Sequence, residues 1–128
     1  MGRSSHDRGA AAVEFALVLP LLALLTFGII AFGHVFHVQT TLDNGARDAV
    51  RIYVLTEGDA AATDARDAAK NSVSPTLTLS DSQIAVTPAG CPAGATARVS
   101  ITLADFEMLG GFFGTVTLTG TGSMRCNG

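Results

Sequence analysis

Tryptophan is absent from this sequence, tyrosine occurs once, and charged residues make up only 15% of the 128 residues. Hydrophobic residues reach 48%, which is too apolar and too poorly charged for an intrinsically disordered chain. An excess of basic residues is missing too, because 8 Lys and Arg against 11 Asp and Glu leave a formal net charge of −3. Without a basic surface to neutralise phosphates, nucleic acid is not an expected partner. The length suits one ordinary domain.

Charge is missing altogether from one stretch, the 19 residues from Phe15 to Gly33, of which 15 are apolar. In a helix that rises about 1.5 Å per residue, this run can cross the roughly 30 Å core of a bilayer. We therefore predict a single transmembrane segment over residues 15–35. The polar residues 1–9 look too loose to fold, and they carry Arg3 and Arg8, which the positive-inside rule keeps in the cytoplasm. The rest of the chain is then exported.

The helix is expected to continue beyond the membrane. Past the uncharged run, apolar residues recur at steps of three and four, the spacing of one helix face: Val35, Val38, Leu42, Ala46, Ala49 and Tyr53. We predict one long helix over residues 10–56, transmembrane first and amphipathic afterwards, which stops near Gly58. Because Pro20 lacks an N–H and crowds the preceding turn, a kink or local melting is expected there.

Residues 57–128 are predicted to form an exported α+β domain. An Ala-rich helix over residues 59–72, capped by Asp59, comes first. After Pro75 the apolar residues alternate with polar ones, as in strands with one covered face. About four antiparallel strands are expected, around residues 77–79, 84–86, 99–103 and 116–124. The amphipathic half of the long helix is the element available to cover this small sheet.

One further segment, FEMLGGFFG at residues 106–114, is an apolar, Gly-rich loop between the last two strands. Such a loop either packs into the core or forms an exposed contact patch. We favour packing. The segment PAGCPAG at residues 88–94 is expected to be a loop as well.

Cysteine occurs only twice, at Cys91 and Cys126, without the CxxC or Cys/His pattern of a zinc site. Downstream of a membrane segment, these two residues are expected to form a disulfide in an oxidising compartment. The bond would close a loop of about 36 residues and stabilise the fold by about 4 kcal/mol. The alternative is two unrelated buried thiols. His34 and His37 lie one helical turn apart, but two ligands do not make a metal site, and no cofactor is indicated.

Glu14 is the one charged residue between Arg8 and Asp43. A carboxylate in a membrane helix costs up to ~2.5–3.5 kcal/mol at the bilayer centre and less near the interface. Glu14 is therefore either an interfacial residue favoured by the helix dipole or a group that needs a positive partner in the membrane. Sequence motifs around it bear on that choice.

Residues 8–22, RGAAAVEFALVLPLL, resemble the processing site of type IV pilin-like proteins, and most closely that of TadE-like minor pilins of the Tad/Flp pilus. The resemblance implies cleavage after Gly9 by a prepilin peptidase, so that Ala10 becomes the first residue and Glu14 the fifth. The family also has counterparts of three later segments: Gly28–Gly33, Val38–Arg47 and Met124–Cys126. Ala31 and His34 depart from its pattern, which often has an acidic residue and an arginine there.

The resemblance further implies a structural role rather than an enzymatic one. The new ammonium of Ala10 would pair with Glu14 of a neighbouring subunit, and the partners would be major and minor pilins and the pilus assembly platform. The chain would be anchored in the inner membrane with its N-terminus in the cytoplasm. These expectations describe a pilin-like α+β fold whose long helix recruits the subunit into a pilus.

Three alternatives remain open at this stage. The chain could be an uncleaved, membrane-anchored binding module of a secretion or pilus machine. A signal peptidase could cut after residues 31–33, Ala-Phe-Gly, and release a secreted protein that begins at His34. A secreted enzyme is disfavoured because no nucleophile motif such as GxSxG occurs.

Overall fold

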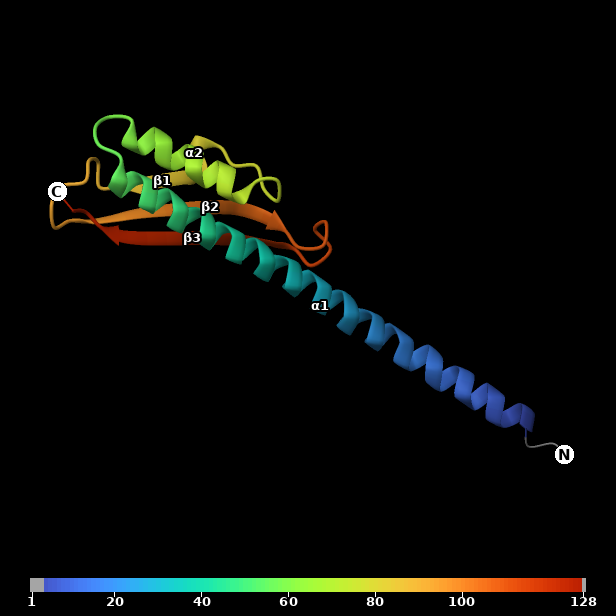
Figure 1. Ribbon diagram of the computed structural model, residues 1–128. Helices are drawn as coiled ribbons and strands as arrows, with labels where there is room; N and C mark the ends of the chain where they lie inside the picture. The colour runs from blue at the N-terminus through green and yellow to red at the C-terminus, as the bar shows by residue number, and fades with distance from the viewer. Residues whose placement is uncertain (1–3, 128) are drawn as a thin grey trace. The chain divides into compact units, whose positions relative to one another are not determined.

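The computed structural model describes residues 4–127, and it divides into two compact units that meet in sequence between Gly33 and His34. Figure 1 labels its helices and strands. The elements in chain order are α1 (Ser4–Leu55), α2 (Ala61–Val73), the 3-10 turn η1 (Asp81–Gln83), β1 (Ile84–Thr87), β2 (Thr96–Glu107) and β3 (Thr115–Arg125).

The first unit consists of the N-terminal part of α1. This helix begins at Ser4, so residues 4–9 are helical, whereas the sequence suggested a leader too loose to fold. Residues 1–3 of the predicted leader lie outside the described residues. The helix runs through Pro20 without a break, and the expected local melting is not present. A proline removes only one backbone hydrogen bond, and the surrounding Leu and Ala residues favour the helix strongly.

The second unit, from His34 onward, is an α+β domain built on a three-stranded antiparallel sheet in the order β1-β2-β3. β1 pairs with β2 from Ile84↔Ile101 to Thr87↔Arg98. The pairing of β2 with β3 shifts register between Leu103 and Phe106, where Asp105 has a φ of 54°. One extra residue on β2 therefore forms a bulge near the end of the strand.

Residues 77–79 do not form the fourth strand that the alternation predicted. Leu79 is buried and Leu77 is half-buried, while Thr76 and Thr78 are exposed. The alternation of apolar and polar residues therefore predicted correctly which side chains face the core. It does not specify whether the backbone pairs with a neighbouring strand, and here the segment leads into η1 instead.

The core lies between the sheet and the two helices, which cover the same face in Figure 1. Five of the six predicted residues of the amphipathic face of α1 are buried in this core, and the sixth, Val35, is half-buried and packs against it. The helix ends at Leu55, one residue before the predicted end. α2 contributes a stripe of small residues spaced by four, Ala61, Ala65, Ala69 and Val73. The N-cap position of α2 is occupied by Ala60 and not by Asp59, and no side chain caps the helix there. The expected cap by Asp59 is therefore not formed.

Glycine allows α1 and β3 to approach each other closely. A Cβ on Gly120 would stand 2.6 Å from the carbonyl oxygen of Leu42, and one on Gly122 would stand 2.5 Å from that of Ala46. These neighbours are backbone atoms of α1, which cannot turn aside as a flexible side chain can, so any larger residue at these two strand positions must displace the helix. The two glycines fix how deeply α1 is set into the sheet.

Candidate assembly surface

The predicted processing site lies in the first turns of α1. Gly9, Ala10 and Glu14 are all exposed and helical, and a Cβ on Gly9 would meet nothing within 4 Å. Among residues 4–127, no ion pair involves Glu14. Ala10 and Glu14 are four residues apart, so they lie on the same side of the helix.

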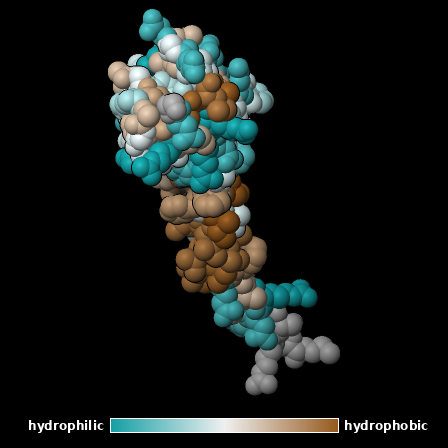
Figure 2. Space-filling view, turned by 60° about the vertical axis from the view of Figure 1, so that its left-hand side comes forward, coloured by the Kyte–Doolittle hydropathy of each residue, from teal (hydrophilic) through white to brown (hydrophobic). Residues whose placement is uncertain are grey.

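Apart from Glu14 itself, the large side chains from Val13 to Phe32 form a continuous apolar surface around α1. Figure 2 shows these residues gathered along the helix. α1 is long and apolar enough to cross a membrane. Phe15 and Leu17, for example, are 65% and 73% exposed. A helical segment that is apolar on all sides is unfavourable in water and suits a membrane. The other exposed members are Val13, Val18, Leu19, Leu21, Leu22, Leu24, Leu25, Phe27, Ile29, Ile30 and Phe32.

The Val38–Arg47 segment supplies the contacts that seat α1 on the rest of the α+β domain. Val38 and Leu42 are fully buried, and Ala46 packs under Gly122. Gly45 lies against α2 and β2, where an added Cβ would stand 2.7 Å from Cγ1 of Val73. The small and apolar residues of this segment are therefore explained by packing within the domain.

Two polar residues of the same segment cap the outer edge of β3. Gln39 donates from Nε2 to the carbonyl oxygen of Thr119 at 2.8 Å, and the backbone N–H of Thr121 donates to Oδ1 of Asp43 at 3.3 Å. Gln39 Nε2 also lies 3.4 Å from both carboxylate oxygens of Asp43. An edge strand offers unpaired backbone groups to other chains, and here helix side chains occupy two of them. Sequence analysis missed this role, because polar residues beside an apolar face look like solvent-exposed positions.

The apolar loop between β2 and β3 is exposed, contrary to the prediction that it packs into the core. Phe112 is 80% exposed and Leu109 is 37% exposed, and no residue from Phe106 to Gly114 is buried. Four residues of the loop have left-handed φ angles: Leu109, Gly110, Gly111 and Gly114. These turns hold the loop away from the core, and apolar composition alone does not reveal which way a loop faces.

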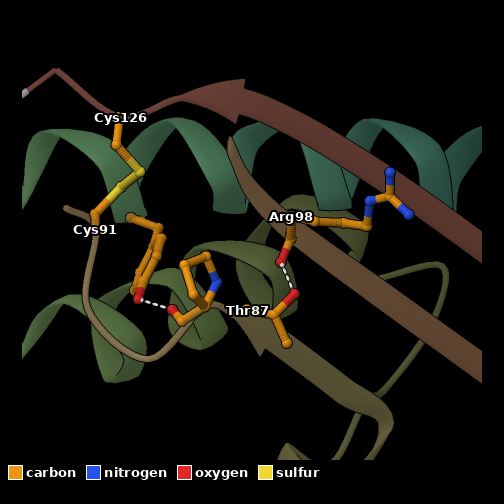
Figure 3. The surroundings of a disulfide bond; sticks show 6 residues. Thr87, Cys91, Arg98 and Cys126 are labelled. Carbon is orange, nitrogen blue, oxygen red and sulfur yellow. Dashed lines mark hydrogen bonds between the residues drawn. A yellow bond between two sulfur atoms is a disulfide. The ribbon is translucent and has the colours of Figure 1, made fainter. Parts of the chain in front are cut away.

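The predicted disulfide between Cys91 and Cys126 is present, with the two Cα atoms 5.5 Å apart (Figure 3). It ties the loop after β1 to the end of β3. The backbone N–H of Cys126 donates to Ala95 at 2.8 Å, and that of Gly94 donates to the Cys126 carbonyl at 3.1 Å. Tyr53, near the end of α1, donates its hydroxyl to the carbonyl of Pro88, three residues before Cys91 in the same loop.

Within residues 4–127, no group of three or more His, Cys, Asp and Glu side chains comes together. His34 stacks instead on Phe106 of β2, with ring centroids 5.6 Å apart.

These features define a small α+β domain that follows an N-terminal helix with the character of a membrane anchor. Residues 9–51 match the family model described as TadE-like protein. The match runs from the predicted processing site through the apolar run to the Val38–Arg47 segment, and it confirms the resemblance over this part of the chain. The matched segment is about a third of the chain. Searches of curated proteins and of solved structures gave no match.

Proposed function

We propose that this protein is a minor pilin-like subunit of a Tad/Flp pilus, cleaved after Gly9 by a prepilin peptidase. The observation that carries the proposal is the exposed helix that combines Gly9, Glu14 and an uncharged apolar run within the TadE-like match. In this role the protein is a structural component and not an enzyme. It is held in the inner membrane with residues 1–9 in the cytoplasm and the domain exported.

Cleavage would give Glu14 a partner. Removal of residues 1–9 creates an ammonium group at Ala10, next to the apolar run. An ammonium and a carboxylate that both leave water gain by pairing, because either group alone is costly to bury. Pairing between the Ala10 ammonium of one subunit and Glu14 of a neighbouring pilin would set the register of docking. The assembly platform and the other pilins would supply the neighbours.

The helix must open locally for the peptidase to act, because residues 4–14 are helical. Glycine destabilises a helix by about 1 kcal/mol relative to alanine, so the chain is weakest at Gly9. A side chain at this position would both strengthen the helix and crowd the scissile bond. Gly9 therefore suits a peptidase in two ways.

The decisive experiment is N-terminal sequencing and intact-mass measurement of the membrane form, in cells that carry the Tad machinery. We expect a chain that begins at Ala10. Gly9→Leu should leave a full-length, membrane-held precursor, because the bulky side chain blocks cleavage.

Gly33→Leu is the matched control, since it places the same side chain in the same helix, where a Cβ also meets nothing within 4 Å. It should be processed normally after Gly9. A chain that begins at His34, and that Gly33→Leu stops from forming, would establish signal-peptidase cleavage instead. A wild-type chain that retains residue 1 would favour an uncleaved membrane-anchored binding module.

A further inference from the structure

The loop from Met108 to Gly114, hereafter the apolar loop, presents its largest side chains outward. Phe112 is 80% exposed and packs edge-on against Phe113, with ring centroids 5.4 Å apart. Leu109 is 37% exposed, and Met108 and Phe113 are half-buried. A protruding Phe-Phe-Leu cluster costs free energy in water and calls for an apolar or interfacial contact.

The apolar loop lies at the end of the domain where the chain arrives from the apolar run. His34, the first residue of this unit, stacks on Phe106, two residues before the loop. The Gln39–Thr119 and Asp43–Thr121 contacts show that α1 and β3 run in the same direction.

Those contacts also fix how far the strand reaches. Stepping back from Thr119 to Thr115 covers about 13 Å of strand, whereas stepping back from Gln39 to His34 covers about 7.5 Å of helix. The start of β3, and the loop before it, therefore extend at least as far as His34, one residue after the uncharged stretch ends.

The loop backbone is well prepared for a poorly hydrated environment. The N–H groups of Met108, Gly111, Phe112, Phe113 and Gly114 all donate to carbonyl oxygens within the loop, at 3.0–3.3 Å. Polar backbone groups that are already paired cost little when they leave bulk water. Of the seven loop residues, Leu109 and Gly110 make no such donation, so most of the N–H groups of the loop are already paired.

The charged residues at this end of the domain favour a zwitterionic lipid surface over an anionic one. Residues 34–46 and 105–117 at this end of the domain contain no Lys or Arg, and Lys70 of α2, which lies toward the same end, is paired with Asp81 of η1. Asp105 and Glu107 are exposed at the base of the loop. Attraction to anionic lipids needs clustered basic residues. Aromatic residues at the headgroup level need no such cluster.

We propose that the apolar loop inserts Phe112 and Leu109 into the interfacial layer of a zwitterionic lipid surface, beside the point where α1 leaves the membrane. The domain then touches the bilayer at two places, the helix and the loop. A two-point contact restrains the tilt and rotation of the domain before assembly. This inference rests on the proposed membrane anchoring of α1.

The absence of tryptophan provides a clean probe. The full chain is reconstituted in two sets of phosphatidylcholine vesicles, whose acyl chains are brominated near the headgroup end in one set and near the chain end in the other, so that both interfacial and central tryptophans are within reach of bromine. Three single-tryptophan variants are compared: Phe112→Trp in the loop, Phe27→Trp in the predicted span, and Leu55→Trp as the control. Leu55 is 67% exposed and lies about 30 Å along the helix from His34. The Leu55→Trp variant controls for the general preference of tryptophan for membrane interfaces, because it introduces the same side chain far from the loop.

We expect the brominated lipids to quench the emission of both the Phe112→Trp and the Phe27→Trp variants, and to leave the Leu55→Trp variant unquenched. Emission of the loop variant should also shift to shorter wavelength on reconstitution. Quenching in Phe27→Trp alone would overturn the loop contact and leave the anchor intact. A wavelength shift in Phe112→Trp without quenching would overturn it as well, because the loop would then contact protein. A chain in which Phe27→Trp is not quenched has no membrane anchor, and both proposals fail.

Discussion

Gly120 of β3 faces the backbone of Leu42 on α1 so closely that a Cβ at position 120 would stand 2.6 Å from the Leu42 carbonyl oxygen. Leu42 lies within the segment matched by the TadE-like family, and Gly120 lies near the other end of the sequence. The helix of the family signature is thus seated by a strand that lies outside the family match.

Substituting Gly122 with alanine should destabilise the domain by about 1–3 kcal/mol, because the new methyl group would overlap the Ala46 carbonyl and must push α1 outward. The measurement is thermal unfolding of the full chain in detergent, followed by circular dichroism. Gly28→Ala is the matched control, since a Cβ there meets nothing within 4 Å. An unchanged melting temperature for Gly122→Ala would contradict the close approach.

Removal of the edge caps should weaken the domain and free the outer edge of β3. Gln39→Ala and Asp43→Ala should each cost about 0.5–1.5 kcal/mol, the usual worth of such hydrogen bonds. Asp43→Asn keeps an oxygen acceptor for the Thr121 N–H and should cost less. The same unfolding measurement applies, and light scattering would detect association through the freed edge. Equal losses for Asp43→Asn and Asp43→Ala would argue against the hydrogen bond.

Mass mapping of unreduced protein from the cell envelope should yield a Cys91–Cys126 peptide. Replacing both cysteines with serine should cost about 4 kcal/mol, as expected for a closed loop of about 36 residues. Cys126 is 2% exposed, so the double Ser variant also places a hydroxyl in the core, and Cys→Ala variants separate the two effects. Free thiols in envelope protein would contradict the bond.

Glu14→Gln should leave membrane insertion, cleavage and the exported domain intact while assembly fails. An unpaired Ala10 ammonium at the docking site would cost about 3–5 kcal/mol, against only ~0.3–1 kcal/mol if Glu14 merely interacts with the helix dipole. Pilus counts and co-purification of partner pilins measure the outcome. Asp7→Asn removes a carboxylate from the part lost on cleavage and should assemble normally. Normal piliation with Glu14→Gln would make Glu14 an interfacial residue only.

The helical part of the fold could be predicted because its pattern is long. Val38, Leu42, Ala46, Ala49 and Tyr53 keep the 3.6-residue period over four turns, and all five are buried. On the same basis the helix was predicted to end at residue 56, and it ends at Leu55. A sustained period reports both the element and the face that it buries.

Shorter patterns carried less information. Leu77 and Leu79 face the core as their alternation indicated, yet pairing depends on a neighbouring backbone that a local pattern does not specify. Phe112 is exposed although it is among the most apolar residues, because left-handed turns at Leu109 and the nearby glycines aim the loop outward. The close approach of Gly120 and Gly122 had a signal in the sequence, since two glycines on one face of a strand mark a backbone contact.

β3 begins at Thr115, far along the sequence from the end of α1 at Leu55, yet it provides the floor on which the amphipathic half of α1 rests. During synthesis, α1 leaves the ribosome well before this strand does. Until β3 emerges, the apolar stripe of α1 lacks this partner within the chain, and the sulfur of Cys91 lacks its partner as well, because Cys126 follows β3. The domain can therefore close only after β3 has emerged, and the disulfide then ties the end of β3 to the loop after β1.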